Sequence, residues 1–136
     1  MKQITLLFLL IVQSTIAQNS LFNQVEANNI GPTIMSGRVV DLAVNPKNPT
    51  EFYVAYATGG LWYTNNNGTS FTPVMDAAET INCGSVTVDW NSGAIWVGTG
   101  EVNASRSSYA GVGVLKSSDK GKTWENLGLK DSHHIS

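Results

Sequence analysis

The chain has 136 residues, a formal net charge of −2 at pH 7, and only 13% of its residues are charged. Such a sparse charge excludes the basic surface that a protein needs to neutralise the phosphates of nucleic acid. Cys83 is the only cysteine, which excludes a disulfide within the chain, and its place beside a predicted strand is typical of a small buried residue.

Residues 1–17 have the pattern of a secretory signal peptide. Lys2 precedes an apolar run at residues 6–12, and small residues end the segment at Ala17. The apolar run is too short to span a bilayer, so we expect no membrane span. The alternative is a buried first strand or helix. We expect the mature chain to be secreted or held at the cell surface, with residues 18–27 as a short lead-in.

Short apolar and β-branched runs follow, separated by Asn, Pro and Gly, and this pattern predicts strands joined by turns. The runs come in two groups of three, at residues 38–46, 51–57 and 59–63 and at residues 84–90, 94–100 and 111–115. The second group contains a longer loop at residues 103–110, where an insertion costs little. The two groups therefore look like copies of one unit.

A motif of the form S-x-D-x-G-x-T-W closes the second group. In it, Asp119 can accept backbone hydrogen bonds in a tight turn, and Gly121 can adopt the positive φ that the turn needs. Ser117 and Thr123 flank the turn with hydroxyl groups, and Trp124 supplies a large apolar anchor. The motif predicts a hairpin turn with its own packing residue.

A weaker copy of this motif closes the first group. Thr64 stands for the serine, Asn66 for the aspartate, Ser70 for the threonine and Phe71 for the tryptophan, while Gly68 is kept. Each replacement preserves a physical role, namely a hydroxyl, a turn-forming side chain or an aromatic anchor. Together the two motifs indicate an internal repeat of the size of one propeller blade.

These motifs resemble the Asp-box (BNR) repeat of sialidase-type and sortilin-type β-propellers, and residues 28–136 are similar to the first two blades of secreted sortilin-like proteins of Bacteroidetes. The resemblance implies an all-β fold, with two four-stranded antiparallel blades of a larger propeller. Residues 133–136 are then the start of a third inner strand. We expect the remainder of the propeller to be a structural partner. The alternative is a small protein that oligomerises to complete a ring.

Two enzyme families share this repeat and provide tests of activity. Xyloglucanases of the Asp-box type carry a general base two residues before a Gly-Gly pair, and here Ala57 precedes Gly59-Gly60 at that spacing. An alanine cannot exchange a proton, so one half of a two-carboxylate mechanism is missing. Sialidases use an arginine to bind the substrate carboxylate, but Arg38 lacks the flanking Phe and Pro of their motif.

Three residues remain as candidates for ligand binding. Arg38 stands at the start of a predicted inner strand, and its alternative role is a strand-end salt bridge with Asp41. Glu101 follows a predicted second strand and forms a polar patch with Arg106 if both line the mouth of the channel; its alternative role is that of an ordinary loop carboxylate. No catalytic residue is assigned.

Metals and cofactors are not expected. His133 and His134 are adjacent, so on a strand they point to opposite faces, and no further ligand stands at a suitable spacing. Residues 65–68 lack the carboxylates of a calcium loop. The chain has four tryptophans that are candidates for stacking on sugars, and at least three are expected in the blade core: Trp62, Trp90, Trp96 and Trp124.

The sequence therefore favours a secreted sortilin-like propeller module that binds a protein or glycan ligand and is not catalytic by itself. The alternative is the N-terminal part of a glycosyl hydrolase, xyloglucanase-like or sialidase-like, that acts on polysaccharide. Fold alone does not decide between them, because propellers host both binding and hydrolysis.

Overall fold

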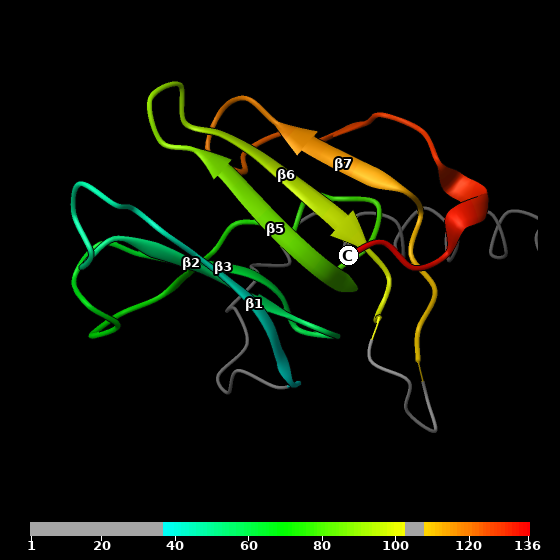
Figure 1. The fold of residues 1–136 in the computed structure, drawn as a ribbon, viewed down its shortest axis with the longest axis horizontal. Coiled ribbons are helices and arrows are strands. Elements are labelled where there is room, and N and C mark those ends of the chain that lie inside the picture. The colour runs from blue at the N-terminus through cyan, green and yellow to red at the C-terminus, as the bar shows by residue number, and fades with distance from the viewer. Residues whose placement is uncertain (1–36, 103–107) are drawn as a thin grey trace, which may run out of the picture. The chain divides into compact units, whose positions relative to one another are not determined.

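A computed structural model describes residues 37–102 and 108–136, so the predicted signal peptide, the lead-in and Arg106 lie outside the described residues. The described chain forms two four-stranded sheets in which each strand pairs antiparallel with the next (Figure 1). The predicted all-β fold is confirmed, and such a four-stranded sheet is the architecture of a propeller blade. The first sheet consists of β1 (Val39–Val44), β2 (Phe52–Tyr56), β3 (Gly60–Thr64) and β4 (Thr72–Pro73), and the second of β5 (Cys83–Asp89), β6 (Ala94–Thr99), β7 (Val114–Ser117) and β8 (Glu125–Asn126).

The two sheets share one register. The residues that face each other across three neighbouring strands form matching rows: Leu42–Val54–Trp62 matches Val86–Val97–Leu115, and Val44–Phe52–Thr64 matches Val88–Ile95–Ser117. The register also shifts at the same place, between Val39 and Asp41 in β1 and between Cys83 and Ser85 in β5. A bulge repeated at the same position of each inner strand supports an internal repeat.

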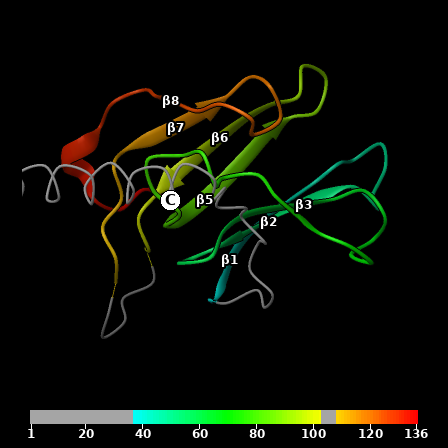
Figure 2. The same cartoon turned by 180° about the vertical axis from the view of Figure 1, so that it is seen from behind.

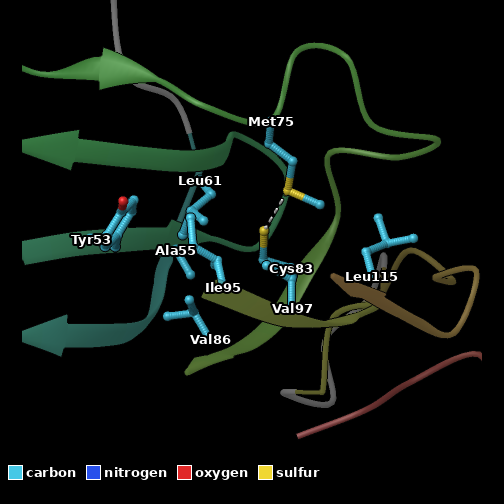
Figure 3. Packing of buried hydrophobic residues seen from close by; sticks show 9 residues of the cluster. All are labelled: Tyr53, Ala55, Leu61, Met75, Cys83, Val86, Ile95, Val97 and Leu115. Carbon is cyan, nitrogen blue, oxygen red and sulfur yellow. Dashed lines mark hydrogen bonds between the residues drawn. The ribbon is translucent and has the colours of Figure 1, made fainter. Parts of the chain in front are cut away.

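The core lies between the sheets. β5 contacts β1 and β2, and both views place it beside them (Figures 1 and 2). Alternate residues of β2 (Tyr53 and Ala55) and of β6 (Ile95 and Val97) enter this core, because successive side chains of a strand point to opposite faces. The buried cluster contains residues from both sheets (Figure 3): Tyr53, Ala55, Leu61, Met75, Cys83, Val86, Ile95, Val97 and Leu115. The packed faces therefore hold the two sheets together through apolar burial.

Cys83 belongs to this core, as predicted. It is fully buried, and its Sγ lies 3.6 Å from the Sδ of Met75 (Figure 3). Burial raises the pKa of the Cys83 thiol to about 12, because the thiolate would lose its hydration. Cys83 is thus a packing residue rather than a nucleophile.

Residues 117–124 form the connection from β7 to β8, and its turn is closed by side chains. The Gly121 N–H donates to Ser117 Oγ at 2.8 Å, and the Thr123 N–H donates to Asp119 Oδ1 at 2.9 Å. Gly121 has a φ of 89°, in the left-handed region. The hydroxyl of Thr123 and other donors lower the pKa of Asp119 to about 2, because they favour the carboxylate.

Residues 64–71 form the corresponding connection from β3 to β4. The Gly68 N–H donates to Thr64 Oγ1 at 3.0 Å, and the Ser70 N–H donates to Asn66 Oδ1 at 3.0 Å. Gly68 has a φ of 80°. The amide of Asn66 therefore makes the backbone contact that the carboxylate of Asp119 makes in the second sheet.

The aromatic anchors of the two turns differ in what they contact. The ring of Phe71 meets that of Phe52 edge to face, with centroids 6.1 Å apart; Phe52 begins β2, and Phe71 directly precedes β4 of the same sheet. The indole Nε1 of Trp124 instead donates to the backbone oxygen of Val74 at 3.0 Å. Since Val74 follows β4, the anchor of the second turn connects the two sheets.

Residues 133–136 are not in a strand among the described residues, and the start of a third inner strand stays a prediction. They follow a short 3-10 helix, η1 (Lys130–Ser132). The backbone hydrogen bonds explain where the segment lies: the Ile135 N–H donates to Thr99 O, and His133 O accepts from the Gly111 N–H. The segment ahead of β5 makes a similar pair of bonds: the Cys83 N–H donates to Ala57 O, and Ile81 O accepts from the Gly60 N–H. In both segments the accepting residue lies two positions before the donating one.

Candidate functional site

An ion pair joins the ends of two strands from different sheets. Arg38 directly precedes β1, and Glu101 follows β6. The Arg38 Nη2 donates to Glu101 Oε1. The side chain of Arg38 is 45% exposed, whereas that of Glu101 is 4% exposed. The pair therefore presents one half-exposed guanidinium that a buried carboxylate holds in place.

The burial of Glu101 follows from the backbone around it. Gly100 has a φ of 90°, and a Cβ at this position would press against the backbone oxygen of His133. The Glu101 N–H donates to the backbone oxygen of Tyr109 at 3.0 Å. A buried carboxylate is costly unless it is paired, so Arg38 supplies the compensating charge.

This pairing bears on the alternative roles of both residues. The alternative role of Arg38, a strand-end salt bridge with Asp41, is not observed, because the carboxylate of Asp41 accepts from the Val86 N–H at 2.8 Å and from the Leu42 N–H at 2.8 Å. Asp41 therefore caps backbone groups and ties β1 to β5. The alternative role of Glu101, an ordinary loop carboxylate, is also wrong, because its side chain is buried and ion-paired.

Tyr109 was not chosen from the sequence, yet it stands next to this pair in the backbone. Its ring is 54% exposed, and its carbonyl accepts the Glu101 N–H. The sequence signal that could have identified Tyr109 is an aromatic residue near the end of the polar loop that follows Glu101. Arg106, the third predicted ligand residue, lies outside the described residues, so its place relative to Glu101 stays a prediction.

Ala57 adjoins the same end of the sheets. It is buried, its N–H donates to Arg38 O at 2.8 Å, and its carbonyl accepts the Cys83 N–H at 3.2 Å. Ala57, at the position where xyloglucanases carry a general base, therefore joins the two sheets through its backbone hydrogen bonds. The described residues place Glu101 as the carboxylate that contacts Arg38.

Other predicted candidates take structural places. Trp62 is 5% exposed, and Trp90 and Trp124 pack against the core, as expected for at least three of the tryptophans. The ring of Trp96 is half-buried and lies 5.5 Å from the Nζ of Lys116, a cation–π distance. In the part of the chain that the structure describes, no group of three or more His, Cys, Asp or Glu is arranged to hold a metal.

Solved structures that are similar to this chain include two GH74 enzymes. A GH74 enzyme of Niastella koreensis is 25% identical with a TM-score of 0.49, covering 67% of this chain and 14% of that protein. The GH74 xyloglucanase from Xanthomonas campestris is 19% identical with a TM-score of 0.45, covering 65% of this chain and 15% of that protein. No family model and no curated protein matches the chain.

Among residues 37–102 and 108–136, no helix is long and apolar enough to cross a bilayer.

Proposed function

We propose that this chain belongs to a secreted, sortilin-like Asp-box propeller that binds a glycan or protein ligand and is not catalytic through the residues described. The repeat supports this proposal: both sheets have the same register, the same bulge and the same side-chain-closed turn between the third and fourth strands. Residues 1–17 act as the export signal in this proposal.

The proposed domain organisation is two blades within residues 28–136 that lead into a third. Its support is the backbone pattern of residues 133–135, which contacts the end of β6 as residues 81–83 contact the end of β2. A further inner strand would then begin where this segment leaves the second sheet. The rest of the propeller is a structural partner of the two described sheets in this proposal.

The Arg38–Glu101 pair is the observation that carries the binding function. A guanidinium has five N–H donors in a rigid fork, and the contact with Glu101 leaves donors of Arg38 available on its exposed side. The buried carboxylate fixes the guanidinium in advance, so less side-chain entropy is lost when a ligand binds. The exposed ring of Tyr109 adds a surface on which the apolar face of a pyranose can stack. This combination favours a glycan.

An oligosaccharide array followed by titration calorimetry tests the proposal. We expect the chain to bind a subset of neutral or acidic oligosaccharides. Arg38→Ala and Tyr109→Ala should each weaken the best ligand at least about tenfold, since each removes roughly 1.5–3 kcal/mol of charged hydrogen bonding or apolar contact. Arg38→Lys should restore only part of the affinity, because lysine lacks the planar fork.

Lys47→Ala provides the matched control. Lys47 is an exposed cation in the β1–β2 turn, where its Nζ donates to Asn91 Oδ1 at 2.9 Å. We expect this variant to bind as the parent does. If no oligosaccharide binds, or if the Arg38 and Lys47 variants lose affinity equally, the Arg38–Glu101 pair is not a glycan site.

The alternative function is part of a polysaccharide-degrading glycosyl hydrolase. One feature favours it: Glu101 is a buried carboxylate that follows β6 and contacts Arg38 at the start of β1. Glycoside hydrolysis generally uses two carboxylates, about 5–10 Å apart. The position expected for the general base holds Ala57, which has no carboxyl group. We therefore expect no turnover of xyloglucan or sialosides. Turnover that disappears in Glu101→Gln but persists in Lys47→Ala would establish the hydrolase instead.

A further inference from the structure

Asn67 and Gly68 lie in the turn between β3 and β4, and an Asn-Gly pair is chemically labile. The glycine has no side chain to hinder its backbone nitrogen, which can attack the side-chain carbonyl carbon of the asparagine. Asn67 is exposed, so water and hydroxide reach its amide. The reaction takes place within the chain, and the conformation of the turn therefore decides how fast it runs.

The reaction exchanges one bond of the Asn67 side chain for a bond to the backbone. The Gly68 nitrogen loses its proton and bonds to Cγ of Asn67, while the bond from Cγ to Nδ2 breaks and Nδ2 leaves as ammonia with that proton. Water then opens the resulting five-membered imide at one of its two carbonyl groups. The product is aspartate or, from the other opening, isoaspartate, which inserts an additional carbon atom into the main chain.

The native turn holds the attacking nitrogen in a hydrogen bond. The Gly68 N–H donates to Thr64 Oγ1 at 3.0 Å. Thr64 is 2% exposed, and its hydroxyl also donates to Asn66 Oδ1 at 2.9 Å, which fixes the position of the acceptor. Attack requires the nitrogen to lose the proton that Thr64 accepts, so this hydrogen bond has to break first.

The backbone of Asn67 is fixed as well. Its N–H donates to Thr50 O at 2.9 Å, and its φ is 57°, in the left-handed region. A residue with a Cβ has only a narrow range of ψ there, so the Cα–C bond of Asn67 does not turn the Gly68 nitrogen toward Cγ while these hydrogen bonds are formed. The closed turn, with these bonds intact, is therefore unreactive, and the reaction proceeds from an open form.

We propose that Asn67 is a site of spontaneous deamidation that the closed turn protects, so that conversion at this residue records the opening of the turn. The record is irreversible, because ammonia is lost and the chain is altered. In isoaspartate the additional main-chain atom changes the spacing between the Thr64 hydroxyl and the Gly68 N–H, so the turn no longer closes with its original hydrogen bonds. The inference does not depend on the ligand proposed above.

Peptide mapping by tandem mass spectrometry during incubation at mildly alkaline pH measures the reaction, because the change from amide to acid alters the mass and the fragments assign it to one residue. We expect Asn67 to convert at least about tenfold more slowly in the folded chain than in the same chain in guanidinium chloride, since the open form is a minor part of the folded population. Equal rates in the two conditions would overturn the proposal.

Thr64→Val tests the hydrogen bond to Gly68. The variant keeps the shape of the side chain but lacks the acceptor, so its rate in the folded chain should rise at least about fivefold, the factor that one hydrogen bond contributes. Thr64→Ser is the matched control: it retains the hydroxyl, as Ser117 does in the second turn, and should stay close to the parent rate. Circular dichroism checks the fold of both. A folded Thr64→Val that converts as slowly as the parent contradicts protection by this bond.

Asn66→Asp is a second variant, which decides the matter if Thr64→Val does not fold. It gives the first turn the carboxylate of Asp119, whose Oδ2 accepts from the Thr123 hydroxyl at 2.7 Å in the second turn. A more strongly bonded turn opens less often, so Asn67 should convert more slowly than in the parent when the chain is folded and at the parent rate when it is denatured. Unchanged or faster conversion in the folded variant contradicts protection by the turn.

Lys120→Asn moves the labile pair to the second turn. Lys120 has a φ of 62°, and the Gly121 N–H donates to Ser117 Oγ at 2.8 Å, so the new asparagine precedes a glycine that is held in the same way. We expect this site to be at least as well protected in the folded chain as Asn67. Conversion there at the rate of the denatured chain would show that the shared geometry of the turns does not protect, and would overturn the proposal.

Discussion

The two turns between the third and fourth strands have the same backbone but different positions in the packing. In both, a hydroxyl accepts a glycine N–H and an Asx side chain accepts the N–H four residues later. The first turn holds its aromatic anchor, Phe71, against Phe52 of its own sheet. The anchor of the second turn, Trp124, donates to the backbone oxygen of Val74, which follows the last strand of the other sheet. Two turns with the same local hydrogen bonds can thus place their aromatic residue either against their own sheet or against the neighbouring one.

The largest expected difference lies at the glycines. Gly121 has a φ of 89°, and a Cβ there would press against the carbonyl oxygen of Val74; at Gly68 (φ 80°) the nearest atom, Cζ of Phe71, would be 3.5 Å away. Gly121→Ala should therefore lower the free energy of unfolding by about 3 kcal/mol, from strain and overpacking, and Gly68→Ala by about 1 kcal/mol from strain alone. Urea titration measures both, and equal losses would show that the second turn is no more constrained than the first.

A smaller difference is expected at the anchors. Trp124→Phe keeps an aromatic ring but removes the donor to Val74 O, so we expect a loss of about 1 kcal/mol in the free energy of unfolding. Amide hydrogen exchange at Val74, whose N–H donates to Leu61 O, should become faster in this variant. Phe71→Leu is the matched change in the first turn and should leave the exchange at Val74 unchanged. Faster exchange in both variants would remove the distinction between the anchors.

The smallest difference is one of pH. The donors around Asp119 lower its pKa from 3.8 to about 2, so the stability that this carboxylate contributes is complete above about pH 4 and is lost as the pH falls toward 2. Asp119→Asn removes this titration, as Asn66 already does in the first turn. The parent should therefore lose more thermal stability than Asp119→Asn over this range. An NMR titration that places the pKa of Asp119 near 3.8 would contradict the expected loss.

The fold could be predicted largely because its signals are local. Alternation along β2 and β6 and the spacing of residues 117–124 act over a few neighbours, so the strand order and the position of the turns follow from short windows. The lengths of β4 and β8, two residues each, were not apparent, because strand pairing that short depends on the adjacent sheet rather than on propensity.

The candidate site depends instead on contacts between distant parts of the chain. The sequence offered Asp41, three residues away, as the salt-bridge partner in the alternative role of Arg38, whereas the observed partner, Glu101, is 63 residues away and follows a strand of the other sheet. Only the packing of the sheets brings the two charges together. The segment at His133 also passes close over Gly100, next to Glu101. That segment is more than 30 residues away in the sequence, so no short window around Glu101 contains it.

The backbone hydrogen bonds that link each sheet to the segment after it bear on how such a chain folds during synthesis. The N–H of Cys83 reaches Ala57 O, and that of Ile135 reaches Thr99 O, so an arriving segment can be anchored on the sheet made before it. Nearest-neighbour contacts of this kind let assembly advance from one unit to the next as the ribosome releases the chain. A chain that is free to fold only as far as residue 83 would then have its first sheet capped by the beginning of β5, with the core face of that sheet still uncovered by β6.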